Sequence, residues 1–427
     1  MPSIRPFKAL IYNKKQIKDY AKVVAPPYDV ISPAMQEALY KQHKNNVVRL
    51  ILGKIRKADN ASDNRYIRAK KFMESWLREN VLAPDDKEAI YLYSQKYKYE
   101  DKWIERIGFI SLIRLEMGGK KKVLPHENTL KAPKMDRLNL MKSVAANLSP
   151  IFMLYEDERD KITGILKRTV SSKKPFIDIN IDNIRNRVWK ISGKGDIGKI
   201  KEFMKNKDVF IADGHHRYET AVNYAALIEN SGAPQSLKNN SKYALAYFCK
   251  LDDRSLTILP THRIIKDIGR LSRDLILKRL GEFFAIDEYG SSGKLVSALK
   301  GSRGYHAFGM YMGGKKFYCL KLKDEKTAHS AMGKGSADWK NLDVAILHLF
   351  IIQNILDIRD EDDNIEFIKD AGEAVKSVAK GISKLAFLLN PTKVTEMKKV
   401  AEHGEKMPRK ATYFYPKLLS GLVINKF

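Results

Sequence analysis

The residues best suited to chemistry stand together in ADGHHR, residues 212–217, where an acid and a glycine precede two histidines and an arginine. The apolar VFI before this stretch is typical of a buried strand, and YETAVNYAALI after it has apolar residues at helical spacing. Gly214 permits a positive φ or a close approach of the backbone. The amides and the dipole at a helix start favour an anion, and His215, His216 and Arg217 add donors and charge. The pattern therefore favours a phosphate site.

A metal site and a structural helix cap are the two alternatives for this stretch. Two adjacent histidines diverge in a strand or a helix, and no third or fourth ligand follows at a recognisable spacing, which weakens a zinc interpretation. A helix cap requires only a polar residue at the first turn, so that alternative stays open.

A second polar cluster is VLPHENTLKAPKMDRLNL, residues 123–140, whose polar residues we expect to lie in a loop with two prolines, followed by a short helix. Loops carry many catalytic groups. The structural alternative is a solvated loop with a salt bridge between Asp136 and Arg137 on the next helix. The polar residues of this cluster are His126, Glu127, Lys134, Asp136 and Arg137.

Two shorter motifs have both a structural and a functional interpretation. In ILPTHRII, a β-branched run pauses at Thr261, His262 and Arg263, as in an edge strand with a polar bulge or in a ligand contact. In VVAPPYDVIS, two prolines stiffen the chain before Tyr28 and Asp29. Asp29 is then either a turn-capping acid or a carboxylate held for catalysis.

Near its end the chain combines basic and aromatic residues in MPRKATYFYPK, residues 407–417. Such interleaving can stack nucleic-acid bases. A terminal strand that packs its aromatic side chains into a core is the favoured interpretation, with Arg409, Lys410 and Lys417 as its basic residues.

These motifs together suit phosphoryl transfer at one composite site. Four of the nine histidines fall in three of them, namely His126, His215, His216 and His262. The motifs contain acids, histidines, arginines and lysines but no evident nucleophilic serine or cysteine elbow. Phosphoryl transfer needs cations, amides and often Mg²⁺ around the phosphate, plus a base for the attacking hydroxyl. The P-loop signature G-x-x-x-x-G-K-S/T is missing from the sequence, so we do not expect a P-loop kinase.

Composition indicates a folded protein with more than one domain. The 427 residues are 44% apolar and 10% aromatic, which is enough to build substantial cores. Cys249 and Cys319 are the only cysteines, too few for a disulfide framework or a four-cysteine zinc site. No apolar run is long enough for a membrane span, and the first residues lack the pattern of a secretory signal. We therefore expect a soluble cytoplasmic protein.

The formal net charge of +28, from 78 basic and 50 acidic residues, raises the expectation of an anionic partner. The basic residues are scattered, however, as in a lysine-rich proteome, and no helix-turn-helix signature or basic arm is evident. We therefore expect a small-molecule substrate and a phosphate donor as partners, rather than nucleic acid or a membrane. The sequence leaves the oligomeric state open.

The pattern of elements predicts an α+β or mixed α/β fold. We expect a helix that starts at Pro33 with Ser32 as its cap, a helix over about Ser62–Glu79, a β-hairpin over 89–116 and a strand at Ile151–Tyr155. Residues 231–241 are expected to be an exposed loop. We divide the chain into an N-terminal α+β region that contributes pocket loops, an α/β region with the DGHHR turn, and a C-terminal α+β region, at 1–155, 156–270 and 271–427.

The order of the motifs resembles the domain-of-unknown-function 1015 family. RPFKALIY, VVAPPYDVIS, NVVRL, VLPHENT, DRLNL, IADGHHRYETA, PTHR and MPRKATYFYPK follow one another as is typical of that family, over nearly the full length. The family name carries no function.

A more distant resemblance is to the ParB/sulfiredoxin-like fold, whose members include free-serine kinases with a closely similar D-G-H-H-R turn. It implies a nucleotide-binding core of that fold with N- and C-terminal elaborations. It also implies that the turn faces the phosphates and any Mg²⁺, with Asp213 as the metal ligand. Free-serine kinases use an acid near the N-terminus as a base, a role open to Asp29 or Glu127. Sulfiredoxin chemistry is disfavoured because its reactive cysteine has no counterpart beside the turn.

We therefore expect a phosphotransferase that acts on a small hydroxyl metabolite, with free L-serine as acceptor and ATP, ADP or pyrophosphate as donor. The alternatives are a phosphoserine phosphatase-type hydrolase, a ParB-like nucleotide-dependent DNA-binding regulator, and a metabolite-binding protein without catalysis. The catalytic candidates are Asp29, Glu127, Asp213 and His216. The phosphate or nucleotide ligands are Gly214, His215, His216, Arg217, His126, Arg137 and Arg263. The substrate contacts are Tyr28, Thr261, His262, Asp136 and Lys410.

Overall fold

A computed structural model describes residues 3–119, 121–252, 254–358 and 364–427. The chain forms two compact units, whose residue ranges interleave. The first unit contains residues 1–125, 129–256 and 416–427, and the second contains residues 126–128 and 257–415. The units do not follow the three expected ranges, because strands from the first two of those ranges pair in one sheet.

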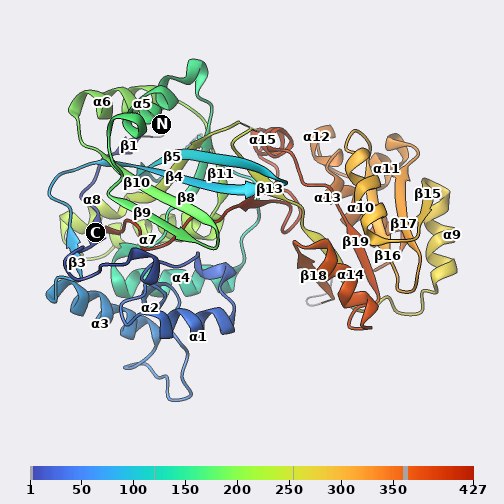
Figure 1. Cartoon of the computed structure of the whole chain (residues 1–427), viewed down its shortest axis with the longest axis horizontal. Coiled ribbons are helices and arrows are strands. Elements are labelled where there is room, and N and C mark those ends of the chain that lie inside the picture. The colour runs from blue at the N-terminus through green and yellow to red at the C-terminus, as the bar shows by residue number, and fades with distance from the viewer. Residues whose placement is uncertain (1–2, 120, 253, 359–363) are drawn as a thin grey trace. The chain divides into compact units, whose positions relative to one another are not determined.

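The first unit is built on a mixed nine-stranded sheet (Figure 1). Its strand order is β6-β11-β8-β12-β5-β4-β10-β9, and β1 pairs with β5. The sheet is mixed because β11 runs parallel to β6 but antiparallel to β8. The strands are β1 (Ile4–Arg5), β4 (Ile90–Tyr99), β5 (Lys102–Arg114), β6 (Val123–Pro125), β8 (Ile151–Tyr155), β9 (Ile177–Ile181), β10 (Ile184–Ile191), β11 (Val209–Asp213) and β12 (Tyr243–Lys250).

The longest strands of this sheet confirm the expected β-hairpin. Tyr99 of β4 lies opposite Lys102 of β5, so the turn consists of two residues. These residues, Glu100 and Asp101, have φ values of 45° and 62°, as a two-residue hairpin turn of type I′ requires. The predicted strand at Ile151–Tyr155 is also confirmed, as β8.

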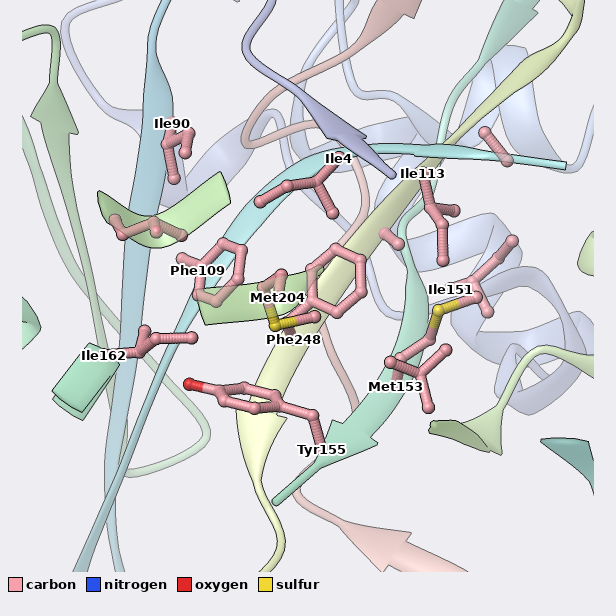
Figure 2. Close-up of a cluster of buried hydrophobic side chains, with 14 of the residues drawn as sticks. Ile4, Ile90, Phe109, Ile113, Ile151, Met153, Tyr155, Ile162, Met204 and Phe248 are labelled. Atoms are coloured by element: carbon pink, nitrogen blue, oxygen red, sulfur yellow. The ribbon is translucent and has the colours of Figure 1, made fainter. Parts of the chain in front are cut away.

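One face of the sheet carries the apolar core of the first unit (Figure 2). Phe109, Met153 and Phe248 come from three neighbouring strands, and Ile162 of α5 (Lys161–Ser172) and Met204 of α6 (Lys194–Met204) pack against them. Alternate strand residues point to the same face, so the period of two in these strands places the apolar set on one side.

The helices of the first unit begin where the sequence signals predict. Ser32 accepts a hydrogen bond from the Met35 amide at 3.2 Å, and Pro33 occupies the first helical position. The helix expected over Ser62–Glu79 is confirmed with slightly later bounds. In Figure 1, α1 to α4 lie together, away from α5 and α6. The helices are α1 (Pro33–Gln42), α2 (Val48–Ile51), α3 (Arg65–Arg78), α4 (Lys131–Val144), α5 (Lys161–Ser172), α6 (Lys194–Met204), α7 (His215–Glu229) and α8 (Gln235–Ser241).

Two segments expected as loops are helical. Lys134, Asp136 and Arg137 lie in α4 rather than in a loop. Pro133 is the third residue of α4, where a missing N–H breaks no intrahelical bond. The loop prediction for residues 231–241 is wrong over its second part, because α8 begins after Pro234. Proline directly before or at a helix start is compatible with the helix, and the rest of α8 is polar without being irregular.

Short strands complete the first unit. β2 (Leu10–Tyr12) pairs with β3 (Leu82–Pro84), and β7 (Ala146–Asn147) pairs with β21 (Asn425–Lys426) near the C-terminus. The second pair ties the last residues of the chain to the middle of the first unit.

The second unit contains a six-stranded antiparallel sheet with the order β15-β17-β16-β19-β14-β18. β14 pairs with both β18 and β19, so the edge-strand interpretation of PTHR is wrong. A separate pair joins β13 to β20. The strands are β13 (Thr257–Leu259), β14 (His262–Ile265), β15 (Phe284–Tyr289), β16 (Ala307–Tyr311), β17 (Phe317–Leu322), β18 (Ile365–Ile368), β19 (Leu385–Leu388) and β20 (Tyr413–Tyr415).

Helices pack around this second sheet and enclose an apolar core. Ile264, Leu295 and Leu388 belong to that core. The segment after α13 winds as a π-helix, η4, in which hydrogen bonds close over five residues instead of four. The elements are α9 (Arg273–Phe283), α10 (Ser292–Gly301), α11 (Glu325–Ala331), α12 (Ala337–Lys340), α13 (Asp343–Ala345), η4 (Ile346–Ile355), α14 (Ala371–Ala379) and α15 (Val394–Glu402).

The fold class is therefore mixed α/β, as predicted, with one large mixed sheet and several smaller sheets. Among the helices in the described part of the chain, none has both the length and the apolar character that a membrane crossing requires.

Candidate functional site

The ADGHHR stretch forms the predicted strand, turn and helix. β11 ends at Asp213, Gly214 is the turn residue with φ of 93°, and α7 begins at His215. A Cβ atom at Gly214 would lie 2.9 Å from the guanidinium of Arg217, which folds back over the turn. Glycine is therefore favoured here by the left-handed backbone, and a Cβ at this position would displace the Arg217 guanidinium.

The carboxylate of Asp213 is shared by two cations. Oδ2 accepts a hydrogen bond from Arg217 Nη2, and Oδ1 accepts one from Lys417 Nζ. The three side chains are only 12–14% exposed. Arg217 also donates to the carbonyl of Pro150. We call Asp213, Arg217 and Lys417 the turn triad; it holds one more positive than negative charge.

A second acid, Asp136, is shared in the same way by Arg65 and Arg137. Arg137 Nε donates to Asp136 Oδ2 at 2.7 Å, which confirms the predicted salt bridge, and Arg65 pairs with Oδ1. The hydroxyl of Tyr66 donates to Oδ1 at 2.7 Å. We call Arg65, Asp136 and Arg137 the helix triad, since Asp136 and Arg137 lie on α4. It too holds an excess of one positive charge.

Tyr28 lies against the helix triad. The Arg137 guanidinium stacks on its ring, 3.9 Å from the centroid. Burial, with a smaller contribution from Asp29, raises the pKa of Tyr28 to about 12, against an opposing effect of Arg137 and Arg217. The phenol is therefore neutral at physiological pH and able to donate a hydrogen bond.

Arg137, Arg217 and Tyr28 line one pocket of about 500 Å³ in the first unit, measured out to its opening to solvent. No acidic residue is among the described residues of its lining, although Asp136 and Asp213 are hydrogen-bonded to the two lining arginines. The remaining polar residues of the lining are Asn147, Ser149 and Thr220, and the apolar ones are Ile51, Leu140, Met141, Ala146, Leu148, Ile151 and Leu245.

Several donors in this pocket have no protein acceptor among the described contacts. An arginine has five N–H groups. Arg137 uses three of them, for Asp136 and for the carbonyl of Ile51 at 2.6 Å. Arg217 uses two, for Asp213 and Pro150. A pocket with cationic donors left over and no acid in its described wall can hold an anion.

The two histidines of the turn do not line the pocket. His215 is buried. His216 Nε2 accepts a hydrogen bond from the Leu130 amide at 3.0 Å, so this nitrogen carries no proton, and the contact fixes the residue before α4. Glu219 of α7 reinforces this contact, because it accepts hydrogen bonds from Thr129 at 2.5 Å and Lys134 at 2.9 Å. His216 thus connects α7 to α4.

Six of the predicted site residues belong to the second unit. They are His126, Glu127, Thr261, His262, Arg263 and Lys410. Their place in one composite site with Arg217 stays a prediction. Lys410 is exposed, and its amide donates to Glu127 Oε1 at 3.4 Å.

Arg263 is the centre of this second group and is fully buried. It donates to His348 Nε2 at 3.0 Å and to the carbonyls of Thr261, Arg409 and Lys410. These contacts join β14 to η4 and to the segment before β20. They are the contacts of a structural arginine.

The histidines of the second group are also buried. His126 Nε2 lies 3.0 Å from Thr412 Oγ1. His262 Nδ1 accepts a hydrogen bond from the Leu389 amide at 3.2 Å. Burial, with a smaller effect of Arg263, lowers the pKa of His262 to about 4.

Asp29 is the exposed neighbour of Tyr28 in the short helix η2 (Tyr28–Val30). It is the predicted base candidate that lies in the same unit as the pocket, whereas Glu127 belongs to the second unit.

The arrangement does not fit a Mg²⁺ ion held by Asp213. Both of its carboxylate oxygens are paired with cations. Within the described ranges of the chain, no group of three or more His, Cys, Asp or Glu side chains is placed to hold a metal. The role of Asp213 as a metal ligand thus stays a prediction that these contacts do not support, and we derive no step through a metal.

Sequence reasoning missed the partners that complete both triads. Lys417 was recognised only as part of a basic–aromatic stretch, and it meets Asp213 across 204 positions. Arg65 and Tyr66 meet Asp136 across about 70 positions. No local spacing in the sequence indicates such contacts. Only the basic character of residues 407–417 indicated that Lys417 could contact an acid.

The family model described as "Protein of unknown function (DUF1015)" matches residues 4–345. This is most of the chain, and the chain belongs to that family. No curated protein matches the chain.

Solved structures show only a weak likeness. A free serine kinase in complex with AMP is 15% identical, with a TM-score of 0.32, over 69% of this chain and 83% of that one. A conserved hypothetical protein from Pyrococcus furiosus is 14% identical, with a TM-score of 0.32, over 70% and 89%. SbnI with a C-terminal truncation from Staphylococcus aureus is 10% identical, with a TM-score of 0.36, over 73% and 85%.

Proposed function

We propose that this member of the DUF1015 family is a phosphotransferase that acts on a small hydroxyl metabolite, with free L-serine as acceptor and ATP, ADP or pyrophosphate as donor. The observation that carries the proposal is the pocket of the first unit, in which Arg137, Arg217 and Tyr28 present donors and no acid is in the described wall. The resemblance of ADGHHR to the turn of free-serine kinases supports serine as the acceptor, and a ParB/sulfiredoxin-like core belongs to the same proposal.

The excess of positive charge explains why this pocket suits phosphoryl transfer. A phosphoryl group in transfer spreads its negative charge over its oxygens, and catalysis consists mainly of positioned positive charge. Each triad contributes one arginine to the wall and holds two cations for one acid. The acids are hydrogen-bonded to the arginines and are not among the lining residues, so they orient the guanidinium groups while each triad keeps one net positive charge.

The proposed roles follow from position. Arg217 and the amides after Gly214 hold the transferring phosphate, and Asp213 orients Arg217. Arg137 and Tyr28 hold a second anionic group of the substrates. Asp29 is the proposed general base for the attacking hydroxyl, because its exposed carboxylate follows Tyr28 directly.

The deciding experiment incubates the purified protein with L-serine and each donor, with and without Mg²⁺, and detects phosphoserine by mass spectrometry. We expect phosphoserine with at least one donor. Replacing Arg217 by methionine should lower kcat/KM by about 100-fold, as for other groups that stabilise transition-state charge. The matched control is Arg168→Met on α5, whose side chain is exposed and pairs with Asp196.

A second arm of this experiment offers phosphoserine and water without a donor, because the same pocket would serve the phosphatase alternative. Release of phosphate in this arm, without synthesis of phosphoserine in the first, assigns the hydrolytic direction. If neither arm shows turnover, the proposed function is wrong.

A further inference from the structure

We infer that Lys417 is a positioning residue for the anion pocket: by sharing the Asp213 carboxylate, it preserves the positive charge of Arg217 for the ligand. The inference rests on the proposed function only for the identity of that ligand. It assigns a role in the site to the C-terminal segment, residues 416–427, which returns to the first unit after the whole of residues 257–415.

The geometry of the turn triad is that of one acid between two cations. Lys417 Nζ meets one oxygen of Asp213 and Arg217 Nη2 meets the other. Without Lys417, Asp213 and Arg217 would form a neutral pair at i and i+4 on one turn. With Lys417 the cluster carries one net positive charge, and all three side chains are largely shielded from solvent. Shielding keeps such a charge effective at short range.

A buried clamp fixes the backbone from which Lys417 extends. Arg106 of β5 donates to the carbonyl of Pro416 at 2.6 Å, and Gln95 of β4 donates to the carbonyl of Lys417 itself at 3.1 Å. Arg106 and Gln95 are both fully buried. The clamp therefore holds the first two residues of the C-terminal segment on the sheet.

The clamp is itself held by a hydrogen-bonded network across the sheet. Arg106 donates to Gln95 Oε1. Asn186 Oδ1 of β10 accepts from Gln95 at 3.1 Å and from Tyr93 at 2.6 Å. Burying an arginine is unfavourable unless its donors are engaged. Here Nη2 of Arg106 donates both to Gln95 and to the carbonyl of Pro416, so the network within the sheet fixes the backbone from which Lys417 extends.

The clamp and the acid belong to connected strands. The Arg106 guanidinium lies over the ring of Phe152, 4.7 Å from its centroid. Phe152 of β8 is in turn the register partner of Asp213 in β11. The sheet thus fixes the distance between the backbone of Lys417 and the carboxylate of Asp213. A lysine on a free loop would have no such fixed distance to its partner.

The test measures binding of inorganic pyrophosphate by isothermal titration calorimetry. Lys417→Met leaves the turn triad neutral, and we expect its affinity for pyrophosphate to fall about tenfold. Lys417→Arg restores the charge and should bind within about threefold of the wild type. The control is Lys174→Met, which changes an exposed lysine of the first unit and should have no effect.

A double variant separates charge sharing from a structural role. In Asp213→Asn with Lys417→Met, Arg217 again provides one net positive charge, and binding of pyrophosphate should recover most of the loss. A lysine that only supported the fold would not be rescued by removing the acid. Circular dichroism melting confirms that each variant is folded.

The inference is overturned if Lys417→Met binds pyrophosphate like the wild type, or if neither Lys417→Arg nor the double variant recovers binding. It is also overturned if the wild type binds no pyrophosphate. If the wild type binds pyrophosphate and the variants behave as expected, but no phosphoserine forms with any donor, the proposed function fails and the inference stands.

Discussion

Arg217 in GHHR and Arg263 in PTHR have the same local signature, an arginine after a histidine, but different surroundings. Arg217 lines a pocket and keeps N–H groups without a protein acceptor among the described contacts. Arg263 is fully buried and bonds to three backbone carbonyls and a histidine. The comparison shows that residue type and motif do not separate an arginine that lines a pocket from a structural one. The two arginines differ instead in their burial and in the number of N–H groups that bond to protein acceptors.

The largest effect should come from replacing Arg263 by methionine. The change leaves buried carbonyls and His348 without their donor, and breaking a buried charged contact costs about 4 kcal/mol. Hydrogen exchange of the amides in β14 and β19 should report an opening free energy lower by about that amount. Arg270→Met, an exposed arginine of the same unit, is the control. Unchanged exchange in β14 would contradict the structural role of Arg263.

Acid should destabilise the second unit through His262. The pKa of this histidine is about 4 in the folded chain, below the ordinary value of 6.5. The unfolded chain therefore binds the proton first, and stability that is present above pH 6.5 is lost as pH falls to 4. The loss should approach about 3 kcal/mol. Burial is the largest cause of this lowered pKa. Arg263 lowers the pKa further, and Asp370 raises it.

The measurement is again hydrogen exchange of β14, now at pH values between 7 and 4. His262→Asn keeps an acceptor for the Leu389 amide and does not titrate, so its opening free energy should depend less on pH. An equal pH dependence in that variant would assign the acid sensitivity to other groups.

Arg217→Met should lower ligand affinity and leave the stability of the second unit unchanged, whereas Arg263→Met should lower that stability. We expect pyrophosphate affinity to fall by about 100-fold, since a charge-assisted, multidentate contact is removed. Hydrogen exchange of the second unit should be unchanged. If Arg217→Met lowered the stability of the second unit but kept its affinity for pyrophosphate, the proposed difference between the two arginines would be wrong.

The smallest effect should come from Tyr28→Phe, which keeps the stack on Arg137 and removes only the hydroxyl. One neutral hydrogen bond contributes about 1 kcal/mol, so affinity for O-phosphoserine should fall about fivefold. Titration calorimetry measures the change, and Tyr305→Phe provides a control at an exposed tyrosine of the second unit. Equal affinity in Tyr28→Phe would show that the phenol only supports Arg137.

The sequence was sufficient for features that depend on neighbours along the chain. The hairpin over 89–116, the Ser32 cap before Pro33 and the strand, glycine and helix of ADGHHR are all present. Side-chain periodicity, capping and the φ preference of glycine act within a few residues, so their signals are local. The start of α4 and the helix α8 were missed because proline and polar residues also occur at helix starts.

Only the tertiary structure decided which charged residues meet. Asp213 is oriented by Arg217, four residues away, and also by Lys417, 204 residues away. The same holds for Asp136, which Arg65 reaches from another helix. Pairing across such distances depends on how whole segments pack in the fold. Burial and hydrogen bonding of each segment determine the position of its side chains. For this chain, the sequence by itself determined that a strand, a glycine turn and a helix form at ADGHHR, and the packing of distant segments determined which charged side chains surround that turn.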